Sequence, residues 1–317
     1  MAVELEFQDY DHDITLLDTG YQRPNFAACY LIQDAGQAAF IDTGTDNTVP
    51  RALRLLALKG IAPQAVAYVI LTHVHLDHAG GAGRMMQYFP NATLVVHPRG
   101  ARHMVDPTRL RAGVIDVYGE AAFERDYGTL IPVPAQRIME APDGHEIVLG
   151  ARALRFLDTP GHANHHVCIW DARSRGWFTG DTLGVAYQEL AVAGRPFALL
   201  SSTPVQFDPE ALHRSLDRLW AYRPERAFLA HFGQVRAMAP LFAGLRASIA
   251  AHVRIAERYA DSDDRYRRIR AALLAQFEVD LRAHGCAFTP QRIAEFLRLD
   301  LDLNTQGLEV WLDRRAA

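Results

Sequence analysis

Short apolar runs separated by turn residues fill the first two-thirds of the chain. Residues 27–32 and 38–41 are mostly apolar and flank an Asp-Ala-Gly turn, a pattern typical of a β-hairpin. Leucines recur at helical spacing over residues 49–59 and a glycine follows, which predicts a helix that ends there. Residues 66–71 are apolar on both faces and predict a buried strand. Further strands are predicted at residues 93–97, 145–149, 153–158, 166–170, 176–179 and 227–230, and a helix at 208–220.

After about residue 235 the pattern changes to arginine-rich helices. They are predicted at residues 238–260, 263–283, 290–299 and 305–314. Thr289-Pro290 and Asn304 are typical of helix N-termini and would begin the last two helices. We therefore expect a catalytic domain at residues 1–235 and a helical C-terminal extension, packed on it, at residues 236–317.

Two segments, residues 105–135 and 183–207, are long for loops in a compact domain. Loops of that length are usually lids or walls of a binding site. We expect substrate selectivity to reside in these two segments.

Composition narrows the classes of partner. The formal net charge is −4, from 37 acidic and 33 basic residues, and Lys59 is the only lysine. Binding to nucleic-acid phosphates favours an excess of basic residues, so we expect no nucleic-acid partner. A single lysine also argues against Schiff-base chemistry and against a phosphate-binding P-loop. Any carboxylate or phosphate group of a substrate would then be held by arginine, by backbone or by metal.

Targeting segments are not evident in the sequence. No segment approaches the roughly 20 apolar residues that span a bilayer, so we expect no membrane partner. The N-terminal stretch is acidic and lacks the basic and apolar regions of a signal peptide. The cysteines, Cys29, Cys168 and Cys286, are widely separated and odd in number, which is typical of buried thiols in a reducing compartment. A cytoplasmic protein is therefore expected.

The run Thr72-His73-Val74-His75-Leu76-Asp77-His78 directly follows the predicted strand 66–71. Alternate side chains of an extended chain point the same way, so His73 and His75 can face one point in space. A turn after them can bring Asp77 and His78 towards a neighbouring point. Three imidazoles and a carboxylate suit a borderline cation such as Zn²⁺, Fe or Mn. A metal site is predicted here, because four polar groups at a strand end would otherwise each need a separate partner.

Four further strand ends carry an aspartate or a histidine. Asp42 follows residues 38–41, His162 follows 153–158, Asp181 follows 176–179 and His231 follows 227–230. A strand holds such a side chain rigidly while the adjoining loop leaves it accessible. Each is a weak signal alone, but together and in this order they strongly support the predicted metal site.

These five motifs resemble those of the metallo-β-lactamase superfamily, over roughly residues 12–235. The resemblance implies an α+β fold, a four-layer αββα sandwich in which two mixed sheets lie face to face with helices outside. It places the metal site at one edge and makes Asp42 an aspartate that orients ligands. Within the superfamily, residues 72–81, 100–110 and 160–166 are similar to an uncharacterised branch of glyoxalase II-like hydrolases. The implied ligands are His73, His75 and His162 for a first metal, Asp77, His78 and His231 for a second, and Asp181 as a bridge between them.

The resemblance implies a dinuclear metal-dependent hydrolase with two divalent metal ions, first of all Zn²⁺, with Fe or Mn as alternatives. A hydroxide shared by the two metals would attack a small thioester, ester or lactone. Asp77 could accept a hydrogen bond from this nucleophile as well as bind metal. His165 and His166 come shortly after the motif's histidine, and one of their rings could serve as a proton shuttle or hold a ligand in place. Because the two residues begin a strand and point oppositely, at most one of them is expected to face the site. The expected catalytic residues are therefore Asp77, Asp181 and His166.

Several departures from the motifs bear on the reaction. Asp181 stands where true β-lactamases of the superfamily commonly have cysteine, which disfavours antibiotic hydrolysis. A lactonase acting on N-acyl homoserine lactones stays an alternative, although Gly184 stands where such enzymes typically have tyrosine. A single-iron persulfide dioxygenase, using the equivalents of His73, His162 and Asp181, is another.

The C-terminal extension takes the place of the glutathione-binding helices of glyoxalase II, but it has no lysine and no clear match to their pattern. The expected partner is therefore a small-molecule substrate, and specificity for glutathione is disfavoured. An apolar helical tail could also support a homodimer.

Overall fold

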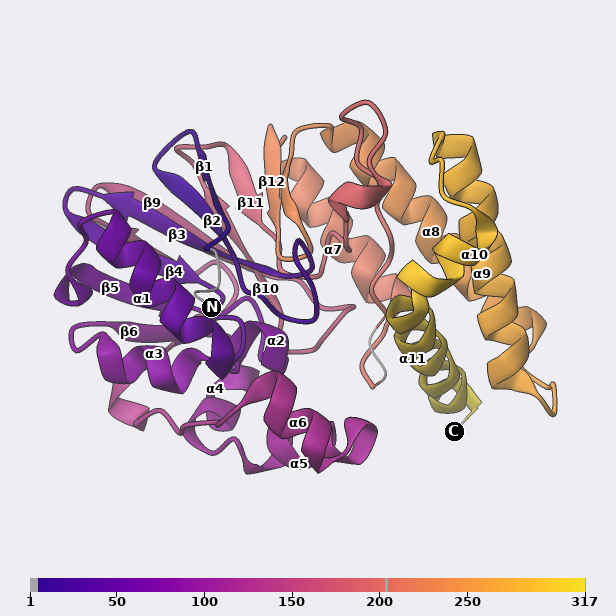
Figure 1. The fold of residues 1–317 in the computed structure, drawn as a ribbon, viewed down its shortest axis with the longest axis horizontal. Helices are drawn as coiled ribbons and strands as arrows, with labels where there is room; N and C mark the ends of the chain where they lie inside the picture. The colour runs from indigo at the N-terminus through magenta and orange to yellow at the C-terminus, as the bar shows by residue number, and fades with distance from the viewer. Residues whose placement is uncertain (1–4, 203–204, 317) are drawn as a thin grey trace. The chain divides into compact units, whose positions relative to one another are not determined.

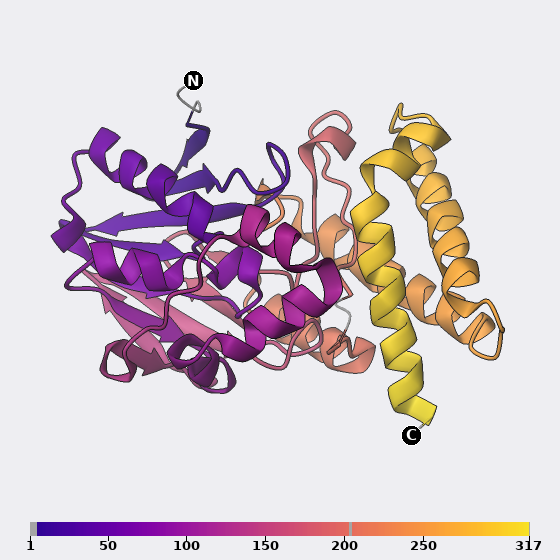
Figure 2. The same ribbon diagram turned by 60° about the horizontal axis from the view of Figure 1, so that its bottom comes forward.

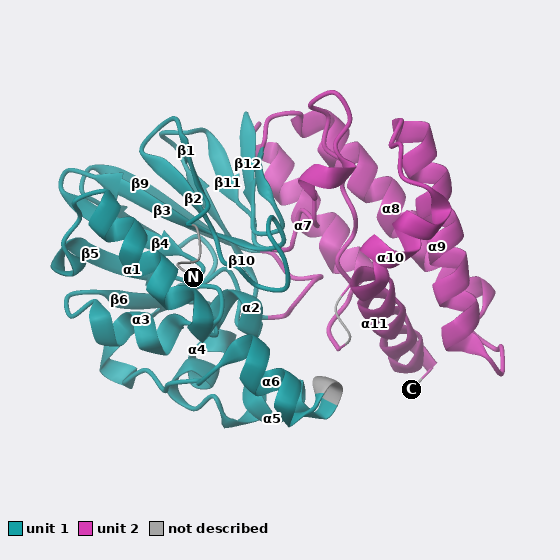
Figure 3. Ribbon diagram, in the orientation of Figure 1, with its two compact units in different colours: residues 1–158, 165–180, 225–234 teal, residues 159–164, 181–224, 235–317 magenta. Residues whose placement is uncertain are grey.

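The computed structural model describes residues 5–202 and 205–316, which form two compact units (Figure 3). Unit 1 comprises residues up to 158 together with 165–180 and 225–234, and unit 2 comprises residues 159–164, 181–224 and those from 235 onward. The division into a catalytic domain and an extension at residue 235 stays a prediction. No helix among the described residues has the length and apolar content needed to cross a membrane.

Unit 1 contains a seven-stranded sheet in which the strands follow chain order. The first four strands pair antiparallel, and the fourth to the seventh pair parallel. Parallel neighbours end at the same edge of a sheet, so the residues that follow the fourth and fifth strands emerge together. The strands are β1 (Phe7–Tyr10), β2 (Ile14–Asp18), β3 (Ala28–Asp34), β4 (Gln37–Ile41), β5 (Val66–Ile70), β6 (Thr93–Val96) and β7 (Ile138–Glu140).

A second, six-stranded sheet has the order β13-β12-β11-β10-β9-β8. Its strands are β8 (Glu146–Leu149), β9 (Arg152–Asp158), β10 (Val167–Asp171), β11 (Gly176–Phe178), β12 (Arg226–Leu229) and β13 (Gly233–Val235). Strands β8 to β11 pair antiparallel, whereas β11 and β12 pair parallel. A buried ion pair joins β9 and β10, with Arg152 Nε 3.0 Å from Asp171 Oδ1.

Two large apolar clusters of described residues pack the sheets and helices of unit 1. One contains side chains of both sheets, such as Tyr30 and Phe156, and therefore fills the space between them. The other joins the opposite face of the first sheet to helices α1 (Val49–Leu58), α3 (Ala82–Tyr88) and α4 (Pro98–Val105). These helices lie beside β5 and β6 in Figure 1, and Figure 2 gives a second view of the same layer. The predicted α+β sandwich of two sheets and helices is confirmed.

The segment 105–135, which the sequence pattern presents as a long loop, is mostly helical. It contains α5 (Thr108–Tyr118) and α6 (Glu120–Tyr127), so the loop prediction is wrong there. Leu110 and Phe123 of these helices pack in one apolar cluster with Leu76 of the histidine-rich run. The apolar face is complete only through this contact, which explains why the local pattern is weak. Strands β1, β2, β7 and β13 were likewise not predicted.

Unit 2 contains the helices α7 (Pro209–Ala221), α8 (Met238–Arg258), α9 (Arg265–His284), α10 (Pro290–Phe296) and α11 (Arg298–Ala316). Asp208 and Thr289 cap α7 and α10, where they accept from the backbone N–H groups of Ala211 and Arg292, and the predicted helix start at Thr289-Pro290 is confirmed. The predicted helix start at Asn304 is wrong. Asn304 lies buried inside α11, where its Oδ1 accepts from Ser202 N at 2.7 Å and Ser202 Oγ at 2.6 Å.

The segment 183–207 carries little regular structure among its described residues. It contains the short 3-10 helix η4 (Gln188–Leu190) and two isolated bridges, and residues 203–204 of it lie outside the described residues. Three more 3-10 helices lie in unit 1, namely η1 (Asp46–Thr48), η2 (Pro63–Ala65) and η3 (Ala135–Arg137), and a single helical turn, α2 (Leu76–Ala79), carries part of the histidine-rich run.

Candidate metal centre

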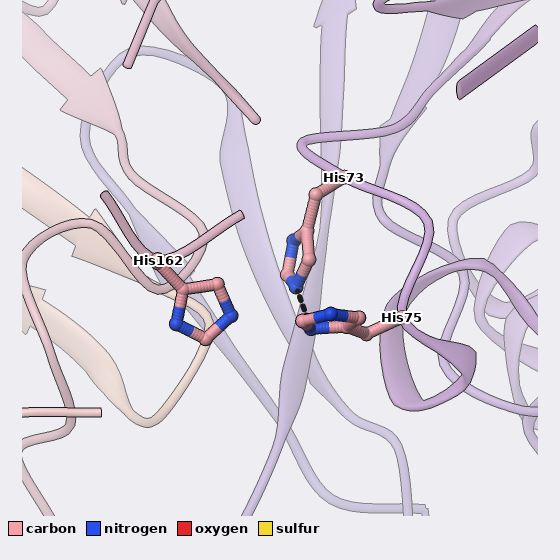
Figure 4. Close-up of side chains that lie close together, drawn as sticks. All are labelled: His73, His75 and His162. Carbon is pink, nitrogen blue, oxygen red and sulfur yellow. Dashed lines mark hydrogen bonds between the residues drawn. The ribbon is translucent and has the colours of Figure 1, made fainter. Parts of the chain in front are cut away.

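The histidine-rich run begins where the chain leaves β5. The Leu71 backbone still donates to Val95 of the neighbouring strand at 2.9 Å, so the sheet fixes the chain up to this point. His73 Nε2 then lies 2.9 Å from His75 Nδ1, with the two rings edge to face (Figure 4). Two ligands of one tetrahedral zinc ion are about 3.3 Å apart, given metal–nitrogen bonds of about 2.0–2.1 Å. The spacing of these two nitrogens is therefore close to that of a metal-bound pair.

Asp42, which directly follows β4, connects the two strand ends. Its Oδ1 accepts from the Thr72 backbone at 2.8 Å, and the Thr72 hydroxyl lies 2.9 Å from Oδ2. His78 Nδ1 lies 3.1 Å from Asp42 Oδ2. Asp42 itself is only 3% exposed, so these contacts fix its carboxylate and, through it, the ring of His78. This is the orienting role that the resemblance implies for Asp42.

Asp77, His78 and His231 form a cluster within unit 1. Their candidate ligand atoms all lie within 4.8 Å of one another. Asp77 Oδ2 is 3.3 Å from His78 Nε2 and 3.4 Å from His231 Nε2, and these distances match the edges of a metal tetrahedron, about 3.3 Å. The two imidazoles are almost completely buried, whereas the Asp77 side chain keeps 23% of its surface exposed. The donor set and its spacing therefore fit a divalent ion with one side open.

The orientation of the histidine rings gives independent support. A histidine that binds metal through one nitrogen usually donates the other ring N–H to an oxygen acceptor. Four of the predicted histidine ligands hold Nδ1 against such an acceptor and thereby direct Nε2 towards a possible metal. The acceptors are the Thr72 hydroxyl for His73 (3.0 Å), the Asp42 carboxylate for His78 (3.1 Å), the Phe26 carbonyl for His231 (2.7 Å) and the Ser201 carbonyl for His162 (3.0 Å).

His162 and Asp181 belong to unit 2. Within it, His162 Nε2 lies 3.4 Å from Asp181 Oδ2, and the Ser201 hydroxyl is 3.5 Å from the same oxygen. Both residues are almost fully buried. The pair has the same imidazole–carboxylate spacing as the unit 1 cluster, and its assignment to a shared dinuclear centre stays a prediction.

The charge state of Asp77 follows from its surroundings. Burial raises the pKa of the Asp77 carboxyl, but the charges and hydrogen bonds of His78 and His231 outweigh burial and hold its pKa well below the usual value. Asp77 is therefore a carboxylate at neutral pH, as a metal ligand must be.

A family model for the metallo-beta-lactamase superfamily matches residues 23–231. The chain belongs to this superfamily. Proteins of this fold are generally metal-dependent hydrolases, and this chain has His/Asp clusters that could hold metal.

Curated proteins of the superfamily resemble the chain at a distance. It is 25% identical over 216 residues to the metallo-beta-lactamase fold-containing protein ST1585 of Sulfurisphaera tokodaii, covering 67% of this chain and 75% of that protein. It is 30% identical over 190 residues to a hydroxyacylglutathione hydrolase of Hahella chejuensis, covering 59% of this chain and 53% of the hydrolase. It is 25% identical over 192 residues to the acyl-coenzyme A thioesterase MBLAC2 of Gallus gallus, covering 57% of this chain and 65% of the thioesterase. The chain thus spans about half the length of the hydrolase.

Solved structures of the superfamily share the fold. A metallo-beta-lactamase family protein from Thermus thermophilus superposes with a TM-score of 0.68 at 21% identity, covering 96% of this chain and 94% of that one. The structure of ST1585 superposes with a TM-score of 0.61 at 22% identity, covering 87% of this chain and 99% of ST1585. At these identities the likeness shows the fold alone.

His166, the third expected catalytic residue, lies against the predicted metal ligand His73. Its ring has no exposed surface and stacks on His73, with centroids 4.8 Å apart. A Cβ at Gly180 would come within 2.5 Å of His166 Nε2 and 2.7 Å of the Thr72 hydroxyl, so only glycine leaves room for this packing. The geometry therefore favours a role in positioning His73, and the catalytic role stays a prediction. The neighbouring His165 instead accepts from the Val74 backbone at 3.4 Å.

Sequence reasoning missed the groups that fix the histidine rings. Thr72 precedes His73 directly, and its hydroxyl was a visible signal for such a role. The Phe26 and Ser201 acceptors are backbone carbonyls, which every residue carries, so the sequence holds no signal for them. They come into place only when segments distant in the chain are brought together.

Proposed function

We propose that the protein is a dinuclear metal-dependent hydrolase that cleaves a small thioester, ester or lactone. The observation that carries the proposal is the cluster of Asp77, His78 and His231. The rings of the two histidines are oriented as in metal ligands, and the chain belongs to a superfamily of hydrolases. The proposed ligands are those of the sequence motifs: His73, His75 and His162 for one metal, Asp77, His78 and His231 for the other, and Asp181 between them.

Chain connectivity supports one shared centre. Asp181 directly follows Gly180, the last residue of its segment in unit 1. His162 is three residues before His165, where the chain re-enters unit 1. Three extended residues span at most about 11 Å, so the backbone of each proposed ligand stays within that reach of residue 165 or residue 180, where the chain belongs to unit 1.

When bound, divalent metals would polarise the substrate carbonyl and lower the pKa of water towards neutrality. The carboxylate of Asp77 is the group that this chain offers to the attacking water. It is ionised, it has one oxygen directed at His78 and His231, and its side chain is partly exposed. Its other oxygen can therefore accept a hydrogen bond from water on the open side and orient it.

Relatives support the choice of substrate class. Two of the distant relatives are named for thioester chemistry, the acyl-coenzyme A thioesterase MBLAC2 and the hydroxyacylglutathione hydrolase. Asp181 in place of cysteine argues against antibiotic hydrolysis, and the net charge of −4 argues against a nucleic-acid substrate. Thioesters are therefore the first substrates to test, with esters and lactones next.

Metal analysis tests the centre, and a substrate panel tests the reaction. Protein purified after supplementation with zinc, iron or manganese should carry two metal ions per chain, and less than one would overturn the centre. Thioester or lactone turnover should be abolished in His73→Ala and retained in His213→Ala, which replaces a half-buried histidine on α7. Turnover of phosphodiesters alone would refute the substrate class. Oxygen consumption with a persulfide, together with one iron per chain, would indicate the dioxygenase instead.

A further inference from the structure

A groove of about 510 Å³ lies within unit 2, between helix α8, the second half of helix α9 and residues 195–199. None of the described residues that line it is a predicted metal ligand. Its volume is within the range of small-molecule sites, roughly 300–1,000 Å³. The groove therefore has the size of a binding site, and the predicted ligands of unit 2 do not form it.

Residues 195–199 form one wall, and contacts at both ends hold this wall in place. Arg195 donates from Nη2 to the His284 carbonyl of α9 at 3.2 Å, and His284 Nε2 lies 3.2 Å from the Arg195 carbonyl. The rings of Phe197 and His284 are 5.3 Å apart. At the other end Leu199 makes an isolated β-bridge. The chain itself fixes the wall, so the groove is formed before any ligand arrives.

The lining of the groove is mostly apolar and leaves free space along α8. Leu241 and Phe277 line it and are almost fully buried, so they lie at its base. Gly244 also lines it, and a Cβ added there would meet no atom within 4 Å. Glycine in the interior of a helix is unfavourable relative to alanine, and the packing of the described residues does not require it here. The space beside Gly244 therefore suits an apolar group that the chain itself does not supply.

The charged side chains that line the groove carry a net positive charge. They are Arg195, Arg254 and Asp280. Asp280 already accepts a hydrogen bond from Gln276 Nε2 at 2.9 Å, and burial raises the pKa of its carboxyl. Arg254 is exposed and pairs with no acidic side chain among the described residues. A positive charge beside an apolar surface favours a ligand that has an apolar chain and an anionic group.

We propose that the groove binds a medium-chain fatty acid, with the alkyl chain beside Gly244 and Phe277 and the carboxylate at Arg254. Ten residues of α8 separate Gly244 from Arg254, which is about 15 Å along the helix, so a chain of medium length can reach from one to the other. A guanidinium group can hold both oxygens of a carboxylate. Each CH2 group that leaves water for an apolar surface contributes about fourfold to affinity, so the chain provides most of the binding. Binding does not depend on the proposed metal chemistry.

The wall of the groove continues into the segment that contacts two predicted metal ligands of unit 2. Leu199 lines the groove, and Ser201 follows two residues later. The Ser201 carbonyl lies 3.0 Å from His162 Nδ1, and its hydroxyl lies 3.5 Å from Asp181 Oδ2. A bound fatty acid would thus contact the segment that orients His162.

Calorimetric titration with decanoate, below the concentration at which it forms micelles, tests the site. The variants Gly244→Leu and Ala247→Leu fill the groove, and the matched control Ala243→Leu adds the same side chain at an exposed position of α8 that does not line it. Each groove variant should weaken binding about tenfold or more, since leucine takes the space of at least two CH2 groups of the ligand. Ala243→Leu should bind as the wild type does. Leucine is a better helix former than glycine, so thermal unfolding should show that Gly244→Leu keeps the fold.

A second comparison tests the carboxylate. Arg254→Gln should weaken decanoate binding about two- to fivefold, the effect of losing an exposed ion pair, and should leave the binding of decanol unchanged. The control with the same change of charge is Arg268→Gln, at an exposed position of α9 that does not line the groove. This comparison does not depend on how the leucine variants fold.

Each outcome supports or overturns the proposal. Decanoate binding that weakens in both groove variants, and in Arg254→Gln but not in Arg268→Gln, supports it. No decanoate binding by the wild type, or binding that is unchanged in both groove variants, overturns the site. Equal weakening in Ala243→Leu and Gly244→Leu overturns it as well. Tighter binding of decanol or decylammonium than of decanoate overturns the assignment to a carboxylate.

Discussion

Two regions of the protein hold a buried histidine in a similar way and with different consequences. In unit 1, His231 directs Nδ1 to the Phe26 carbonyl at 2.7 Å, and its Nε2 lies 3.4 Å from Asp77 Oδ2. In unit 2, His252 on α8 lies with Nδ1 2.8 Å from the Ser248 carbonyl. Its Nε2 is buried without a hydrogen-bond partner among the described residues, and its ring packs near Phe277.

The two residues differ in the feature that separates a predicted metal ligand from a core histidine. Burial and an Nδ1 acceptor are common to both residues, so neither feature identifies a metal site. The difference is the second nitrogen, which lies near a carboxylate in unit 1 and has no hydrogen-bond partner among the described residues in unit 2. The resulting charge states are opposite. Burial keeps His252 neutral at neutral pH, because it lowers the pKa of the imidazole to about 4. The unit 1 histidines keep Asp77 ionised, because they lower the pKa of its carboxyl. Convergence of the Nε2 atoms on Asp77 is therefore the property to test.

The largest expected effect comes from Asp77→Asn. This change removes the charge on which His78 and His231 converge while keeping the size of the side chain. We expect metal affinity to fall more than about 100-fold, because loss of a group that merely orients a ligand already costs about 10–100-fold. Titration with a chromogenic chelator measures it. His252→Phe is the control, and equal metal loss in both variants would contradict the distinction between the two regions.

Asp42→Asn should have a smaller effect. The amide can still accept from the Thr72 backbone but no longer offers a charged acceptor to His78 Nδ1. We expect metal affinity to fall about 10–100-fold with the fold retained, as for other groups that orient metal-bound histidines. The control is Asp34→Asn, at the end of β3, whose carboxylate bonds to Ala151 and Arg173 instead. Unchanged affinity in Asp42→Asn would show that His78 needs no charged partner.

The strand ends explain why most of the site could be predicted from the sequence. Apolar runs with turn residues located β4, β5, β11 and β12, and the aspartates and histidines that follow them were visible as chemistry. Parallel pairing of β4 with β5 and of β11 with β12 brings such ends to one edge within each sheet. The family motifs then assigned these side chains as predicted metal ligands.

Features that depend on distant contacts could not be predicted. Helices α5 and α6 bury few side chains of their own, and the cluster with Leu76 completes their apolar face. Asn304 is a residue type that favours helix starts, yet it sits inside α11 because its amide bonds to Ser202 and to the Leu200 carbonyl. Neither feature has a local sequence signal. The same holds for His252, whose lack of a second partner among the described residues follows only from the packing of α8.

The smallest effect separates the two regions by pH. The pKa of His252 is lowered to about 4 by burial, from 6.5 for an unperturbed histidine. Between these values the unfolded chain takes up a proton that the folded protein excludes, so His252 makes the folded protein less stable as pH falls through 6.5 towards 4. At pH 5 the difference amounts to about 2 kcal/mol in the free energy of unfolding.

His252→Phe removes this contribution, so metal-free wild type should lose about 2 kcal/mol more stability than the variant between about pH 7.5 and about pH 5. Urea unfolding of both proteins at the two pH values measures it, and the histidines of unit 1 cancel because both proteins contain them. His252→Leu serves as a second variant in case phenylalanine overpacks the site. A stability difference that stays constant with pH would mean that His252 takes up a proton as readily in the folded protein as in the unfolded chain. Its Nε2 would then need an acceptor like the one that Asp77 provides in unit 1.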